Sequence, residues 1–134
     1  LGWIYGQDFP MPDGTVMTRS PFNQYMKYQK LFEEQHYGIQ IVAVDGDKYV
    51  GSTDIHIYPK SDPHKAWTGS LGVHREYRRQ GIATALKVKA FEKLREKGVK
   101  QVRTDNEENN PMYLINVALG FKPEPYCYEY QKEI

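Results

Sequence analysis

The stretch Val73-His74-Arg75-Glu76-Tyr77-Arg78-Arg79-Gln80-Gly81-Ile82-Ala83-Thr84 decides the fold, because it joins an apolar strand to an amphipathic helix through a basic turn. The first amides of a helix have no intrahelical partner and carry partial positive charge, so an anion bound there gains hydrogen bonds and dipole attraction. Gly81 has no Cβ, so the backbone can bend sharply and a pyrophosphate can come close to it. Arg78 and Arg79 add positive charge. The stretch predicts a phosphate-binding turn.

The residues on either side of this turn predict a β–α–β unit. Trp67 to Val73 is strand-like, and Gly81 to Lys97 repeats apolar residues at helical spacing until Gly98 ends the pattern. Lys100 to Thr104 is the next strand. Two strands joined through a helix run parallel, with a right-handed crossover.

The rest of the chain predicts more elements around that unit. They are an irregular segment over Leu1 to Thr18, a helix from Pro21 to about Gln35, a hairpin of Gly38 to Val44 and Tyr49 to Tyr58 around Asp45-Gly46-Asp47, a loop from Pro59 to Lys65, a short helix from Asn110-Pro111 to about Leu119, and a last strand from Tyr126 to Lys132. This order predicts one domain over residues 1–134, with a mixed α/β sheet.

Composition narrows the class of protein. The 134 residues are 40% hydrophobic and 26% charged with a net charge of +1, which is ordinary globular usage and favours neither a nucleic acid nor a membrane as partner. The basic residues gather in the middle of the chain, where the lysines beyond Thr84 are interpreted as a solvated helix face. The single cysteine, Cys127, predicts a reducing, cytoplasmic location. The four histidines show no metal-ligand spacing.

A family resemblance follows from these motifs. Arg78-x-x-Gly81-x-Ala83, after Leu71-Gly72-Val73, resembles the acetyl-CoA loop of the GCN5-related N-acetyltransferases, the GNAT family, and Asn109 with Leu119-Gly120-Phe121 resembles the family's downstream motif. The resemblance covers Gly38 to the C-terminus. It implies a mostly antiparallel sheet flanked by helices, acetyl-CoA as cosubstrate, no metal, and a primary amine of a small molecule or peptide as acceptor.

The resemblance also implies which residues bind the cofactor. A backbone amide of Leu71-Gly72-Val73 would face the thioester carbonyl, and Asn109 would contact the pantetheine arm. The implied set is Leu71, Gly72, Val73, Arg78, Arg79, Gln80, Gly81, Ile82, Ala83, Thr84, Asn106, Asn109, Met112 and Asn116.

The catalytic acid and base are less clear, because the chain departs from the family pattern. The strand before the loop contains no carboxylate, so Asp54 and His56, which alternate onto one face of a neighbouring strand, are the candidate base; a half-exposed strand surface is the alternative for each. Asn116 stands where the family carries a tyrosine that protonates the leaving thiolate. An asparagine side chain cannot give up a proton. Tyr113 lies one turn earlier and could replace it, with packing as the alternative.

Three functions remain open. The first is an acetyl-CoA-dependent N-acetyltransferase. The second is a non-catalytic acyl-CoA-binding or structural half-domain, since the chain resembles the second half of bacterial tandem GNAT proteins and could pair with a second such domain or a second copy. A nucleic-acid module is the third, and it is disfavoured because no reader motif is present.

Overall fold

The computed structural model describes Asp8, Val16, residues 18–35, 37–58, 62–106, 110–125, and Lys132. The elements are α2 (Phe22–Gln35), β1 (Tyr37–Asp45), β2 (Lys48–Tyr58), β3 (Asp62–Val73), the 3-10 turn η1 (Arg75–Tyr77), α3 (Ile82–Glu96), β4 (Gln101–Arg103) and α4 (Met112–Ala118). Asn109 and all of the predicted last strand except Lys132 lie outside the described residues.

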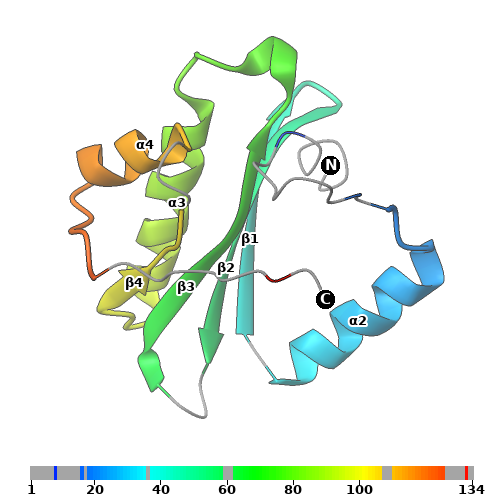
Figure 1. The fold of residues 1–134 in the computed structure, drawn as a ribbon, viewed down its shortest axis with the longest axis horizontal. Coiled ribbons are helices and arrows are strands. Elements are labelled where there is room, and N and C mark those ends of the chain that lie inside the picture. The colour runs from blue at the N-terminus through cyan, green and yellow to red at the C-terminus, as the bar shows by residue number, and fades with distance from the viewer. Residues whose placement is uncertain are drawn as a thin grey trace.

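The four strands form one mixed sheet in the order β1-β2-β3-β4. β1 with β2 and β2 with β3 pair antiparallel, whereas β3 and β4 pair parallel. Helices α3 and α4 lie on one side of the sheet and α2 lies on the other (Figure 1). The predicted mixed, mostly antiparallel sheet with one parallel unit is therefore confirmed.

The strand before the turn that precedes α3 is longer than the sequence predicts. We expected a loop from Pro59 to Lys65, but β3 already begins at Asp62. Pro63 is compatible with this earlier start, because a proline needs no amide donor near the start of a strand. The carbonyl of His64 accepts a 2.8 Å bond from the amide of Lys100, so the strand is held there by the residue that leads into β4.

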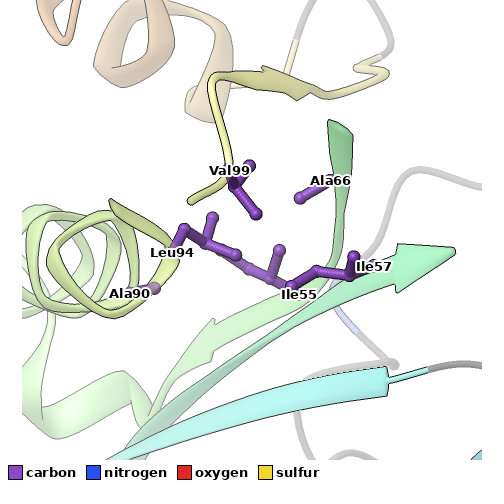
Figure 2. Close-up of a cluster of buried hydrophobic side chains, with 6 residues drawn as sticks. All are labelled: Ile55, Ile57, Ala66, Ala90, Leu94 and Val99. Carbon is purple, nitrogen blue, oxygen red and sulfur yellow. The ribbon is translucent and has the colours of Figure 1, made fainter. Parts of the chain in front are cut away.

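The core lies between the sheet and α3. Its buried residues are Ile55, Ile57, Ala66, Ala90, Leu94 and Val99 (Figure 2). Because side chains alternate along a strand, Ile55 and Ile57 of β2 face α3, and Asp54 and His56 face away from it. The core thus sets which side of the sheet carries these polar groups.

Both helices on that side end as the glycines predict. Gly98 has φ 79°, and the amides of Gly98 and Val99 bond the carbonyls of Arg95 and Leu94, which closes α3 in a Schellman motif. Gly120, with φ 88°, closes α4 in the same way. These closures set where α3 and α4 end. None of the described helices has the length and apolar character needed to cross a membrane.

Candidate functional site

The N-terminus of α3 is open. Gly81 is the N-cap residue with φ 80° and ψ 3°, and no side chain caps the helix among the described residues. The first intrahelical bond runs from the amide of Ala85 to the carbonyl of Gly81, at 3.0 Å. A Cβ on Gly81 would meet no atom of the described residues within 4 Å other than those of its chain neighbours. The amides that follow, those of Ile82, Ala83 and Thr84, have no intrahelical acceptor, which is the chemistry that holds a phosphate.

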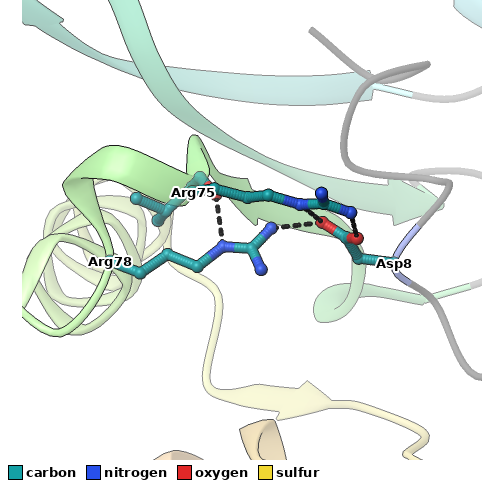
Figure 3. Close-up of polar contacts among 4 residues, drawn as sticks. Asp8, Arg75 and Arg78 are labelled. Atoms are coloured by element: carbon teal, nitrogen blue, oxygen red, sulfur yellow. Dashed lines mark hydrogen bonds and ion pairs between the residues drawn. The ribbon is translucent and has the colours of Figure 1, made fainter.

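Arg75 and Arg78 hold the turn before α3 through side-chain hydrogen bonds. The Arg78 Nε donates to the Val73 carbonyl at 2.9 Å, and its Nη2 donates to the carboxylate of Asp8. Arg75 donates to the same carboxylate through Nε, at 3.3 Å, and through Nη2 (Figure 3). These bonds from Arg75 and Arg78 hold the pKa of Asp8 far below its usual range. The charge of Arg78 is thus paired within the protein, with a partner that no motif in the sequence indicates.

The turn after Arg78 contains two residues with positive φ, Arg79 and Gly81. Arg79 has φ 64°, and no other non-glycine residue in the described part of the chain has a positive φ. Gln80 lies between it and Gly81, and its side chain approaches the Glu76 carbonyl at 3.5 Å. Placing a non-glycine residue in the left-handed region of φ and ψ costs about 1–2 kcal/mol, so the surrounding contacts must impose this conformation on Arg79.

Among the described residues, the edge of β3 next to this turn has no strand partner. Its pairing with β4 runs only from Lys65–Gln101 to Trp67–Arg103, yet β3 continues to Val73. The Thr68 and Thr104 hydroxyls meet at 2.6 Å where the pairing stops. On the other side, the amide of His74 donates to the Val50 carbonyl of β2 at 2.8 Å. Since backbone groups alternate along a strand, the amide and carbonyl of Val73 face away from β2, on the edge that β4 leaves free.

α4 brings a buried asparagine toward this region. Asn116 is 3% exposed, and its Nδ2 donates to the Asn106 Oδ1. The Asn116 Oδ1 is buried and has no hydrogen-bond partner among the residues that the structure describes. Met112 is half-buried at the start of the helix. Tyr113 is 41% exposed, so it does not share the buried environment of Asn116.

Asp54 and His56 form a direct pair on the side of the sheet away from α3. His56 Nε2 lies 2.7 Å from Asp54 Oδ2, and the other carboxylate oxygen accepts bonds from the amide, at 3.1 Å, and the hydroxyl of Ser70. Burial raises the pKa of Asp54, but the bonds from His56 and Ser70 outweigh burial and lower the pKa below its usual value. The sequence placed both residues on one face but could not show that they touch.

Gly69 makes this pair possible. A Cβ at this position would lie 1.8 Å from Asp54 Oδ2 and 2.5 Å from His56 Nε2. Any other residue would therefore force the carboxylate or the imidazole to move. Trp67 stands opposite His56 in the strand pairing, and the Arg103 guanidinium lies 5.7 Å from the Trp67 ring. The pair thus belongs to a polar and aromatic surface built across β2, β3 and β4.

One lysine of α3 departs from the predicted solvated face. Lys87 is 3% exposed, and its Nζ lies 5.7 Å from the centre of the Phe121 ring. Burial alone lowers its pKa from 10.5 to about 8. By contrast Lys89 and Lys93 lie on the surface, paired with Glu92 and Glu96. The reason is the position of α4, because the residue that follows its closing glycine covers Lys87.

Comparison with known proteins identifies the family. The sequence model described as the acetyltransferase (GNAT) family matches residues 3–121. The chain belongs to the GNAT acetyltransferases. N-alpha-acetyltransferase 30 of Schizosaccharomyces pombe is 27% identical over 116 residues, which are 82% of this chain and 73% of that protein.

Solved structures agree with this fold. An acetyltransferase of Trypanosoma brucei has a TM-score of 0.68 at 20% identity, covering 88% of this chain and 84% of its own. The aminoglycoside acetyltransferase AAC(6')-Iy, in complex with the bisubstrate analogue CoA-S-monomethyl-acetylneamine, has a TM-score of 0.65 at 17% identity, covering 85% and 82%. At these identities the likeness concerns the fold. Among the described residues, no group of three His, Cys, Asp or Glu side chains could hold a metal ion.

Proposed function

We propose that this GNAT protein is an acetyl-CoA-dependent N-acetyltransferase that transfers the acetyl group directly to a primary amine of a small molecule or a peptide. The observation that carries the proposal is the open N-terminus of α3 beside the unpartnered edge of β3. Gly81, with φ 80°, leaves the amides of Ile82 to Thr84 available to a pyrophosphate. The edge of Leu71 to Val73 then offers backbone groups to the rest of the cofactor.

The thioester would lie along that edge. Because backbone groups alternate along the strand, the amide of Val73 or of Leu71 would donate to the acetyl carbonyl, and this bond would strengthen as negative charge develops on the oxygen. One preorganised donor of this kind is worth roughly 3–4 kcal/mol, and good alignment of thioester and amine contributes roughly 7–11 kcal/mol more. Little of this depends on side chains. Asn106, Met112 and Asn116 would complete the cofactor site from the α4 side, and the contact of Asn109 with the pantetheine arm stays a prediction.

The amine would approach from the other side of the sheet, where Asp54 and His56 lie. An amine with a pKa near ~10.4 is protonated at pH 7 and must lose a proton before it attacks. We assign that proton to the Asp54–His56 pair, 2.7 Å apart, in which the ionised carboxylate stabilises an imidazolium. Attack then forms the amide and breaks the thioester bond.

The departing group needs no strong acid in this scheme. A thiol near pKa ~8.5 can leave as thiolate. Asn116 would donate a hydrogen bond to the sulfur, and Tyr113 stays the candidate for a proton donor. Support for an amine acceptor comes from the relative that is an N-alpha-acetyltransferase, whose name indicates a terminal amine as acceptor.

Calorimetric titration with acetyl-CoA, followed by a thiol-release assay over a panel of amines, tests the proposal. The panel should include polyamines, aminoglycosides and peptide N-termini. We expect binding that is lost in the Arg78→Ala/Gly81→Trp variant, and CoA release with at least one amine. Failure to bind acetyl-CoA would overturn the proposal.

Binding without acetylation of any amine would favour the second candidate, a non-catalytic acyl-CoA-binding or structural half-domain. The observation behind this alternative is Asn116, which stands where the family's proton donor is expected and is buried against Asn106. Its pairing with a second GNAT domain or a second copy, the bacterial source and the cytoplasmic location stay predictions.

A further inference from the structure

Asp8 is the one described residue before Val16, and it contacts the cofactor turn from 67 and 70 positions away in the sequence. Its carboxylate receives donors from Arg75 and Arg78, and its side chain is 23% exposed compared with 70% for Arg75. Figure 3 shows both guanidinium groups converging on the one carboxylate. Two charge-assisted partners make this contact stronger and more directional than a single surface ion pair.

The side chain of Arg78 connects Asp8 to the backbone of β3. Its Nη2 is bound by Asp8, while its Nε donates to the Val73 carbonyl at 2.9 Å in a partly buried bond. That carbonyl lies on the free edge of β3. Asp8 therefore fixes a side chain that joins the end of β3 to the turn that follows.

The turn needs such a constraint. Arg79 directly follows Arg78 and adopts φ 64°, which a non-glycine residue holds only when its surroundings impose it. Gly81 follows two residues later at φ 80°, and the open amides of α3 begin there. The direction in which these amides point depends on the path of the chain from Arg78 onward.

We infer that Asp8 is a positioning residue for the cofactor site: by holding Arg78 against the Val73 carbonyl, it preforms the turn that presents the α3 amides to a phosphate. This inference rests on the proposed function, because the ligand it concerns is the CoA pyrophosphate. Affinity for the cofactor then depends on a residue that does not touch it.

The direction in which Asp8→Asn changes the affinity for acetyl-CoA distinguishes the positioning role from a purely electrostatic one. Asp8 is a negative charge close to the proposed site of a polyanion, so removing the charge alone would tighten binding. Loss of positioning does the opposite. We expect Asp8→Asn to weaken acetyl-CoA binding about tenfold in calorimetry, as for a lost charge-assisted bond, and Asp8→Glu to recover part of the loss. Unchanged or tighter binding by Asp8→Asn would overturn the inference.

Arg75→Gln is the matched control, since Arg75 shares the carboxylate but makes no bond to Val73. We expect a smaller loss than for Asp8→Asn, and equal losses would contradict the route through Arg78. Hydrogen exchange of the amides from Arg79 to Thr84, measured without ligand, gives a second test. Exchange should be faster in Asp8→Asn, and unchanged exchange would also overturn the inference. If the wild type bound no acetyl-CoA, the proposed function would fail while this second test still decides the role of Asp8.

Discussion

The proposed cofactor side and the proposed acceptor side of this GNAT protein are built by different means. On the proposed cofactor side, the α3 amides and the edge of β3 that β4 leaves unpaired belong to one continuous stretch of backbone, to which the contact of Asp8 with Arg78 adds a long-range constraint. On the acceptor side, Asp54 and His56 of β2 meet Gly69 and Ser70 of β3 only through strand pairing. Backbone chemistry therefore tolerates most side-chain changes on the first side, whereas one added methyl group can break the second.

The largest effect should come from a side chain at the start of α3. Gly81→Val puts a branched residue at φ 80° and fills the space that the phosphate needs, so the cofactor loses at least two charge-assisted bonds. We expect about 4 kcal/mol, or roughly a 1000-fold loss of acetyl-CoA affinity, by calorimetry. Gly98→Val is the matched control, because Gly98 has φ 79° and equally open surroundings at the other end of the helix. Equal loss of affinity in both would mean that strain, not the phosphate site, is responsible.

Lys87→Met tests a cofactor-side feature that the proposed chemistry does not use. Its pKa is about 8 when folded and 10.5 ordinarily, so below pH 8 the folded protein carries the full penalty of a buried ammonium. The variant should be more stable by up to about 3 kcal/mol at pH 7. As the pH rises from 8 to 10.5 the wild type loses that penalty and the difference should vanish. Urea unfolding at pH 7 and pH 10 measures it; equal stability at pH 7 would contradict the burial of a charged lysine.

Gly69→Ala probes the acceptor side. The new Cβ would displace the Asp54 carboxylate or the His56 ring, so we expect kcat to fall about 30-fold, or about 2 kcal/mol, within the range of general base catalysis. Acetyl-CoA affinity should stay within about twofold of wild type, since the change is remote from the α3 amides. Gly38→Ala is the control, because its Cβ would lie at an ordinary 3.8 Å from His56 Nδ1. A normal kcat in Gly69→Ala would remove the pair from the mechanism.

Ser70→Ala should have a smaller effect, limited to the pKa of Asp54. The hydroxyl of Ser70 is one of the donors that keep this pKa below 3.8, and the Ser70 amide remains as a donor in the variant. Because the bond stabilises the ionised form, the wild type should be more stable by at most about 1 kcal/mol at pH 7. The advantage should disappear as the pH falls through the folded-state pKa. Denaturant titrations at pH 7 and pH 3 would show it, and a difference that persisted on acidification would contradict the assignment.

Tyr113→Phe should have the smallest effect. A tyrosine that is 41% exposed, beside a thiolate able to leave unassisted, is expected to change kcat by less than about twofold. Tyr25→Phe on α2, where the tyrosine is 49% exposed, is the matched control. A tenfold or greater loss in Tyr113→Phe alone would show that the cofactor side does depend on a side-chain acid.

Local signals explain which predictions were confirmed. Gly98 and Gly120 end their helices by closures that need only the neighbouring residues, and the Asp-Gly hairpin forms between β1 and β2. The extension of β3 back to Asp62 was missed because it depends on the bond from Lys100, a contact between segments that no local pattern encodes. Lys87 was placed on the surface for the same reason, since only the packing of α4 covers it.

The sequence by itself determined the family, because Arg78-x-x-Gly81-x-Ala83 and the strand and helix on either side of it form one continuous stretch. The tertiary structure alone decided the contact of Asp54 with His56, the need for Gly69 beneath them, and the reach of Asp8 to Arg75 and Arg78. Strand register and chain path bring those groups together, and both are set by burying Ile55, Ala90 and Leu94 between the sheet and α3. Burial of that core is a property of the whole fold, so the residue type at any one of these positions does not reveal the contact.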